Sequence, residues 1–160
     1  MRLLLIRHGI AAPLGGQLAR DQDRPLTAPG RRRMRQVAAG LGHLLPRPRA
    51  IFTSPLLRAR QTADLVARAW GGPRPKVIPA LATGDRRGIR RALAVFEDED
   101  TIVLVGHEDW LSRFTARLLG AGSGRGLRYR KGGVALIESE PDEPSRGRLL
   151  WFIPPRGFGG

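Results

Sequence analysis

Two histidines and several arginines stand where short apolar runs of the sequence end. Each group follows one such run: Arg7-His8-Gly9 follows residues 2–6, Ser54-Pro55 and Arg58 follow residues 50–53, and Gly106-His107-Glu108 follows residues 101–105. If these runs are parallel strands of one sheet, their carboxyl ends lie at the same edge, where such sheets bind ligands. The sequence therefore predicts a site that holds two histidines and at least two arginines.

So much positive charge in one place favours an anionic ligand. Like charges in a partly buried site repel one another, and an anion offsets that cost. A phosphoryl group suits the site because the guanidinium fork matches its oxygens. We also expect Ser54 to cap a helix with Pro55 in its first turn, which would add backbone N–H groups that favour an anion.

A neutral imidazole beside bound phosphate can act as a nucleophile. Attack by His8 on phosphorus would divide hydrolysis into two easier displacements, with water cleaving the phosphohistidine in the second. Arg7, Arg58 and a protonated His107 would stabilise the oxygens of the transferring group. This mechanism requires no metal, and the three histidines at 8, 43 and 107 lack metal-ligand spacing. We expect neither a metal nor a cofactor.

The elements that position these residues alternate between strand and helix. The order expected along the chain is a strand at 2–6, a loop at 9–26, a helix at 29–45 capped by Thr27, a strand at 50–53, a helix at 54–70, a minor strand at 77–78, a helix at 85–97, a strand at 101–105, a helix at 108–119, a loop at 120–126, and strands at 133–138 and 149–153 joined by a turn at 139–147. This alternation predicts an α/β fold with a mostly parallel sheet and helices on both faces.

Several segments together resemble the histidine phosphatase superfamily in order and spacing. They read IRHG, RPLTAPGRRR, SPLLRARQTA, LVGHE and KGG. The size is similar to that of the small SixA-type phosphohistidine phosphatases. The resemblance implies a phosphoglycerate mutase-like three-layer sandwich without a large insertion, in one domain at 1–155 with a flexible tail at 156–160.

The resemblance also implies roles for individual residues. His8 would be the nucleophile, Arg7, Arg58 and His107 would complete the phosphate pocket together with Gly9, and Arg24 would line its entrance. No cofactor is implied.

The chain departs from the family pattern at the proton donor to the leaving group. Many relatives carry a carboxylate directly after RHG, where this chain has Ile10, and the region 71–100 is too short for the acid-bearing insertion of larger relatives. The local carboxylate candidates are Asp21, Asp23 and Glu108, although a helix start makes Glu108 a poor acid, and His107 could donate instead. A weak acid suits a P–N bond better than a phosphate ester, so we expect protein phosphohistidine as the substrate.

Composition limits the partners. The formal net charge is +14, and arginine supplies all but two of the 28 basic residues. This surface would attract anions such as phosphoproteins, and clusters at 31–35 and 86–91 could dock an acidic partner protein. Aromatic side chains are few, so nucleic acid is not favoured. The chain has no cysteine, no signal-like start and no membrane-length apolar run, from which we expect a soluble, cytoplasmic protein.

Two alternatives remain open at this stage. The first is a phosphatase or mutase that acts on a small phosphorylated metabolite. The second is a non-catalytic module that binds phosphate or polyanions through its arginines alone, which predicts that His8→Ala leaves binding intact.

Overall fold

The chain is organised around one mixed sheet. The computed structural model describes residues 1–15, 20–124, 126–139 and 146–159. Within these residues the sheet has six strands in the order β3-β2-β4-β1-β5-β6. The strands are β1 (Arg2–Arg7), β2 (Ala50–Thr53), β3 (Lys76–Val77), β4 (Thr101–Gly106), β5 (Val134–Glu138) and β6 (Arg148–Ile153). The first four are parallel and the last two join antiparallel, which confirms the predicted α/β fold with a mostly parallel sheet.

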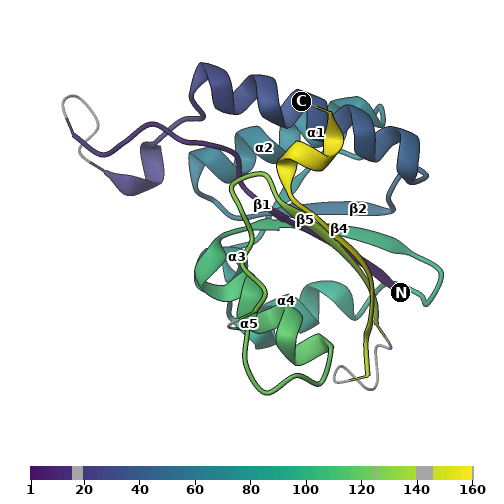
Figure 1. Ribbon diagram of the computed structural model, residues 1–160. Coiled ribbons are helices and arrows are strands. Elements are labelled where there is room, and N and C mark those ends of the chain that lie inside the picture. Colours follow the sequence, from purple (N-terminus) through teal and green to yellow (C-terminus); the bar gives the residue numbers. More distant parts are fainter. Residues whose placement is uncertain (16–19, 125, 140–145, 160) are drawn as a thin grey trace.

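Helices cover both faces of the sheet (Figure 1). One face carries α1 and α2, and the other carries α3, α4 and α5. The helices are η1 (Asp21–Asp23), α1 (Ala28–Leu44), α2 (Leu57–Ala69), α3 (Ala80–Thr83), α4 (Arg86–Leu93), α5 (Glu108–Leu118) and η2 (Pro155–Phe158). Of the helices in the described part of the chain, none is both long and apolar enough to cross a membrane.

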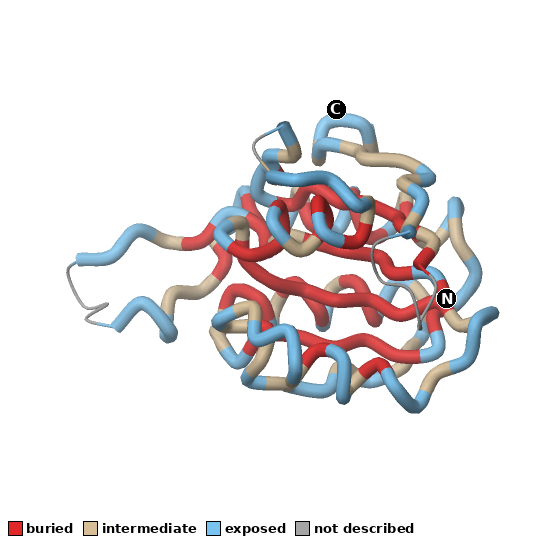
Figure 2. Tube along the Cα trace, turned by 90° about the horizontal axis from the view of Figure 1, so that it is seen from below, coloured by how far each residue is buried: buried red, intermediate tan, exposed pale blue. Residues whose placement is uncertain are grey.

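The central strands are buried on both faces, so their side chains divide between two cores. On β1, Leu3 and Leu5 enter the cluster beneath α3, α4 and α5, whereas Leu4 and Ile6 enter the cluster beneath α1 and α2. The strands form the buried centre in Figure 2, with exposed segments around them. Continuous apolar runs are typical of strands covered on both sides, and this burial fixes the strand ends that carry the site.

Two predictions of helix caps meet different outcomes. Thr27 caps α1 as expected, because its Oγ1 accepts a hydrogen bond from the backbone N–H of Gly30. The expected cap at Ser54 is wrong: α2 begins only at Leu57, with Leu56 in the capping position. Ser54 instead follows directly after β2, and its hydroxyl forms a hydrogen bond with His107 inside the site.

The region between β3 and β4 also differs from expectation. It contains a short helix, α3, that the sequence pattern did not indicate, and α4 ends at Leu93 instead of continuing to residue 97. Gly84 separates the two helices with φ of 76°, in the left-handed region that favours glycine. Because this residue ends α3, Asp85 can cap α4 through its carboxylate.

The end of the chain packs against the body of the protein. Residues 156–159, predicted to be a flexible tail, include most of η2, and Phe158 joins the core cluster beneath α1. The Nη1 group of Arg33 donates a hydrogen bond to the carbonyl oxygen of Gly159 at 3.0 Å. Most of the predicted turn at 139–147 lies outside the described residues.

Candidate active site

Three neighbouring parallel strands deliver the predicted catalytic segments to one edge of the sheet. Arg7 pairs with Gly106 in the β1–β4 register, and the backbone N–H of His8 extends this ladder to the carbonyl of Gly106 at 3.0 Å. On the other side of β4, the N–H of Ser54 donates to the carbonyl of Val105 at 3.1 Å. The strand ends therefore meet as the sequence predicts.

The two histidines and Arg58 come into contact at this edge. The ring centroids of His8 and His107 lie 5.1 Å apart. The Nε group of Arg58, in the first turn of α2, lies 3.2 Å from Nε2 of His8. All three residues are buried, with exposed fractions of 5 to 7%.

Hydrogen bonds on both ring nitrogens define the tautomer of His8. Its Nδ1 lies 2.7 Å from the carbonyl oxygen of Gly9, which only accepts, so Nδ1 carries the proton. Its Nε2 receives the N–H of Arg58, which only donates, so Nε2 presents its lone pair. The structure therefore holds a neutral imidazole whose free electron pair points toward a guanidinium.

Burial keeps both rings neutral. It is the main cause that lowers the pKa of His8 to about 3, with smaller contributions from His107, Arg58 and Arg7, while the hydrogen bond to the carbonyl of Gly9 opposes the shift. Burial, followed by the charge of Arg58, lowers the pKa of His107 to about 4. His107 is thus neutral at neutral pH in this structure, and an anion beside it would raise its pKa toward the protonated ring expected during phosphoryl transfer. Its Nε2 shares a hydrogen bond with the hydroxyl of Ser54 at 2.8 Å.

Asp21 fixes the guanidinium of Arg58. Arg58 donates through Nη1 to the backbone carbonyl of Asp21 at 2.7 Å and through Nη2 to its carboxylate at 2.8 Å. Hydrogen bonds from Arg24 and Arg58 lower the pKa of Asp21. Asp21 lies in η1, on the segment that projects from the site edge at the left of Figure 1. A carboxyl group held ionised in this way is a poor proton donor, so its place in the structure is that of a clamp.

Arg24 joins the site only through this clamp. Its Nη1 donates to the Asp21 carboxylate at 2.8 Å, and its Nε donates to the carbonyl oxygen of Ala12 at 2.5 Å. Asp23, another carboxylate predicted as a donor, is exposed on the same short helix. The projecting segment therefore supplies contacts to Arg58 from outside the sheet.

Arg7 lies on the other side, between a carbonyl and a carboxylate. Its Nη1 donates to the backbone oxygen of Tyr129 and lies 3.7 Å from Oε2 of Glu108. The hydroxyl of Ser112 donates to Oε1 of Glu108 at 2.8 Å. Within the described residues, Nε of Arg7 and Oε2 of Glu108 are buried without a hydrogen-bond partner. Burial lowers the pKa of Arg7, and Glu108 opposes that effect.

Gly9 and Thr62 form a support that the sequence did not reveal. Gly9, expected to help complete the phosphate pocket, donates its N–H to Oγ1 of Thr62 at 3.1 Å. The same hydroxyl donates to the carbonyl of Arg58 at 2.8 Å. A side chain at position 9 would also meet Met34, whose Cγ would lie 2.6 Å from an added Cβ. Thr62 lies one helical turn after Arg58, and that i,i+4 spacing is the signal that could have indicated it.

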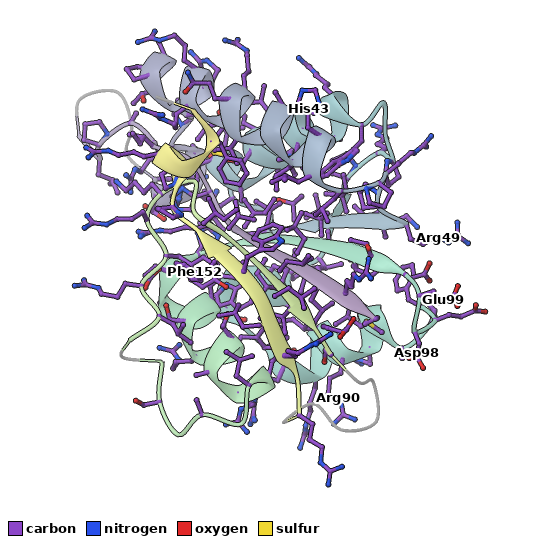
Figure 3. All side chains as sticks on the ribbon, turned by 45° about the vertical axis from the view of Figure 1, so that its right-hand side comes forward. His43, Arg49, Arg90, Asp98, Glu99 and Phe152 are labelled. Atoms are coloured by element: carbon purple, nitrogen blue, oxygen red, sulfur yellow. The ribbon has the colours of Figure 1, made fainter. Side chains whose placement is uncertain are left out.

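The third histidine lies away from this constellation. His43 is exposed near the end of α1, among the side chains of the upper layer in Figure 3. Across the described ranges, no group of three or more His, Cys, Asp or Glu side chains is arranged to hold a metal ion. The cluster that exists is an imidazole lone pair in contact with the guanidinium of Arg58, with the charge of Arg7 nearby, which suits the transfer of a phosphoryl group.

Comparison with known proteins agrees with this geometry. The chain is 39% identical over 144 residues to an uncharacterized protein of Picosynechococcus sp., covering 87% of this chain and 86% of that one. The fold matches the protein histidine phosphatase SixA complexed with tungstate, with a TM-score of 0.86, 24% identity, and coverage of 99% of this chain and 100% of that chain.

More distant structures share the fold. A phosphoserine phosphatase of Entamoeba histolytica in complex with phosphoserine matches with a TM-score of 0.74, 17% identity, and 98% coverage of both chains. A mycobacterial glucosyl-3-phosphoglycerate phosphatase matches with a TM-score of 0.72, 21% identity, and coverage of 96% and 99%. The model of the histidine phosphatase superfamily (branch 1) matches residues 3–83, just over half of the chain. With the site and these matches in agreement, the chain belongs to the histidine phosphatase superfamily, branch 1.

Proposed function

We propose that this protein is a phosphatase that forms a phosphohistidine on His8 and that its substrate is phosphohistidine in another protein. The observation that carries the proposal is the tautomer of His8. Gly9 holds the proton on Nδ1, so the lone pair on Nε2 lies among the groups that would bind phosphate. A histidine kept only for packing would not need its nucleophilic nitrogen aimed at a guanidinium.

The first step transfers the phosphoryl group to the enzyme. The lone pair of His8 Nε2 forms a bond to phosphorus while the bond to the leaving atom breaks and its electron pair stays with that atom. Arg58 and Arg7 balance the charge on the phosphoryl oxygens. The Nε–H of Arg58 then donates its hydrogen bond to a phosphoryl oxygen instead of to Nε2 of His8. Asp21 keeps Arg58 oriented throughout.

The second step returns the enzyme to its starting state. Water attacks phosphorus, the P–Nε2 bond breaks, and its electron pair returns to Nε2 of His8. Both protons of the water stay on the inorganic phosphate, which leaves as dihydrogen phosphate. Nδ1 keeps its proton, which it donates to the carbonyl of Gly9, so His8 is restored as a neutral imidazole. His107 becomes a better hydrogen-bond donor as the anion raises its pKa.

The choice of a P–N substrate rests on the carboxylates. An alkoxide leaving group requires a proton from a positioned acid. Asp21 is held ionised by Arg24 and Arg58, and Glu108 accepts from Ser112 beside Arg7. A phosphorylated imidazole that is already protonated on its other nitrogen leaves as neutral imidazole without such an acid. The fold shared with a structure described as a protein histidine phosphatase supports the same choice.

Phosphate release tests both parts of the proposal. A protein phosphorylated on histidine and p-nitrophenyl phosphate would be compared as substrates, with chelator present, for the wild type, His8→Ala and His43→Ala. His43→Ala is the matched control because that exposed histidine lies outside the site. We expect activity in chelator that disappears only in His8→Ala, together with acid-labile phosphate on the wild-type enzyme during turnover.

The ratio between the substrates decides the substrate class. Faster hydrolysis of phosphohistidine supports the proposal. Much faster hydrolysis of phosphoserine or of a sugar phosphate would instead indicate that the substrate is a small metabolite, as the names of the more distant structures suggest for those proteins. A folded His8→Ala variant with wild-type turnover would refute the nucleophile.

A further inference from the structure

Helix α4 presents a dense group of arginines to solvent. Four of its eight residues are exposed arginines at i, i+1, i+4 and i+5: Arg86, Arg87, Arg90 and Arg91. Residues four apart on a helix are neighbours, and like charges at that spacing destabilise it. Repulsion between these arginines therefore destabilises the helix.

Nothing in the described part of the protein neutralises these four side chains. No carboxylate of the described residues lies within 4.0 Å of them, and none of their guanidinium groups makes a hydrogen bond there. On α1 the arginines are divided: Arg31 and Arg33 donate to backbone carbonyls and so support the fold, whereas Arg32 and Arg35 are exposed. The four on α4 have no such structural role.

The α4 arginines also border a recess. Arg87, Arg90 and Arg91 line an open hollow of about 510 Å³. Directly after the helix, Val95 is 79% exposed. Figure 3 shows Arg90 projecting from the lower layer, opposite α1. The surface therefore combines uncompensated positive charge, a recess and an apolar side chain.

The beginning of α4 is connected to the active site through α3 and α5. His107 is the capping residue of α5, and Trp110 in the first turn of α5 donates to the carbonyl of Leu81 in α3 at 3.0 Å. Gly84 lies between α3 and α4 and packs closely on Trp110, so an added Cβ would lie 2.4 Å from the Trp110 Cβ. Gly84 and Trp110 thus link the beginning of α4 to His107. After the helix the chain runs to Asp100, whose carbonyl accepts from the N–H of Arg2 at the opposite end of β1. A substrate that places its phosphoryl group near His107 therefore needs a further segment to reach the arginines along α4.

We infer that α4 and Val95 form a docking surface for an acidic segment of the phosphoprotein substrate. This inference rests on the proposed function and specifies the substrate further: it should carry carboxylates several residues away from its phosphohistidine. A helix of eight residues is about 12 Å long, and four extended residues span about 13 Å, so a block of four acidic residues matches the helix. Nucleic acid fits less well, since none of the exposed large hydrophobic side chains of the described residues is aromatic.

Paired peptides provide the test. Two phosphohistidine peptides of equal length would carry, after a Gly/Ser spacer of about eight residues, either four Glu or four Gln. The docking variant replaces Arg86, Arg87, Arg90 and Arg91 by Gln. The matched control replaces four exposed arginines outside α4, which lose the same charge: Arg32, Arg35, Arg68 and Arg74.

The expected result is a preference that only the docking variant loses. Each exposed ion pair contributes about a twofold effect, so we expect the wild type to hydrolyse the Glu peptide about tenfold better in kcat/KM. The docking variant should treat both peptides alike, the control should keep the preference, and all three should hydrolyse p-nitrophenyl phosphate equally. The preference should shrink in high salt.

Binding of the unphosphorylated, fluorescently labelled Glu peptide tests the surface separately from catalysis. Loss of this binding in the docking variant alone supports the inference even if phosphohistidine is not hydrolysed, a result that would count against the proposed function only. Equal handling of the Glu and Gln peptides by the wild type, or equal losses in both variants, would overturn the inference. Loss of binding to a labelled DNA duplex, with peptide binding unchanged, would also overturn it.

Discussion

The hydroxyl of Thr62 holds the nucleophile segment in place, so its removal should affect both stability and rate. Thr62→Val keeps the shape but leaves the buried N–H of Gly9 without the acceptor it now has at 3.1 Å. An unsatisfied buried donor costs about 1–3 kcal/mol. For a chain of this length that lowers Tm by roughly 2–4 °C for each kcal/mol. We therefore expect a fall of several degrees in a thermal melt.

The rate should respond through the same contact. The carbonyl of Gly9 orients the His8 ring, and misplacing a reacting group by about 1 Å can cost on the order of 100-fold. We expect Thr62→Val to lower kcat by about tenfold or more while KM changes by less than about twofold. Thr62→Ser retains the oxygen and should retain kcat. A Val variant with the melting temperature and kcat of the wild type would refute the argument that this hydroxyl supports the site.

Three further outcomes follow from the structure. Folding lowers the pKa of both His8 and His107 from 6.5. As pH drops, the unfolded chain therefore binds protons before the folded one. The free energy of unfolding should fall between about pH 6.5 and 4, by at most about 1.4 kcal/mol per pH unit for each histidine. Denaturant titrations at pH 7 and 5 check this, and His8→Asn should make the fall shallower. Gly9→Ala should destabilise the protein by about 1–3 kcal/mol, because the added Cβ meets Met34; a melt unchanged from the wild type would contradict it. Deleting residues 156–160 should lower Tm by a few degrees through the loss of the Phe158 packing, and an unaffected Tm would show that this segment adds no stability.

The sequence by itself determined the order of elements and the residues that meet. Apolar runs too short for helices, separated by helical periodicity, indicate a parallel sheet covered on both faces. Since the carboxyl ends of its strands share an edge, the positions of His8, Arg58 and His107 along the chain were enough to predict that they come together. The motifs also identified the family, because their order and spacing are visible without coordinates.

Contacts between segments distant in sequence were decided only by the tertiary structure. The tautomer of His8 depends on a guanidinium fifty positions away, and the ionised state of Asp21 depends on how a projecting segment folds back onto α2. Ser54 has the pattern of a helix cap, yet its hydroxyl bonds His107, which no local pattern can anticipate. The neutral state of His107 follows from burial, and burial is a property of the packed molecule. The sequence therefore indicates which chemical groups meet, whereas the packing determines their protonation states and their hydrogen-bond partners.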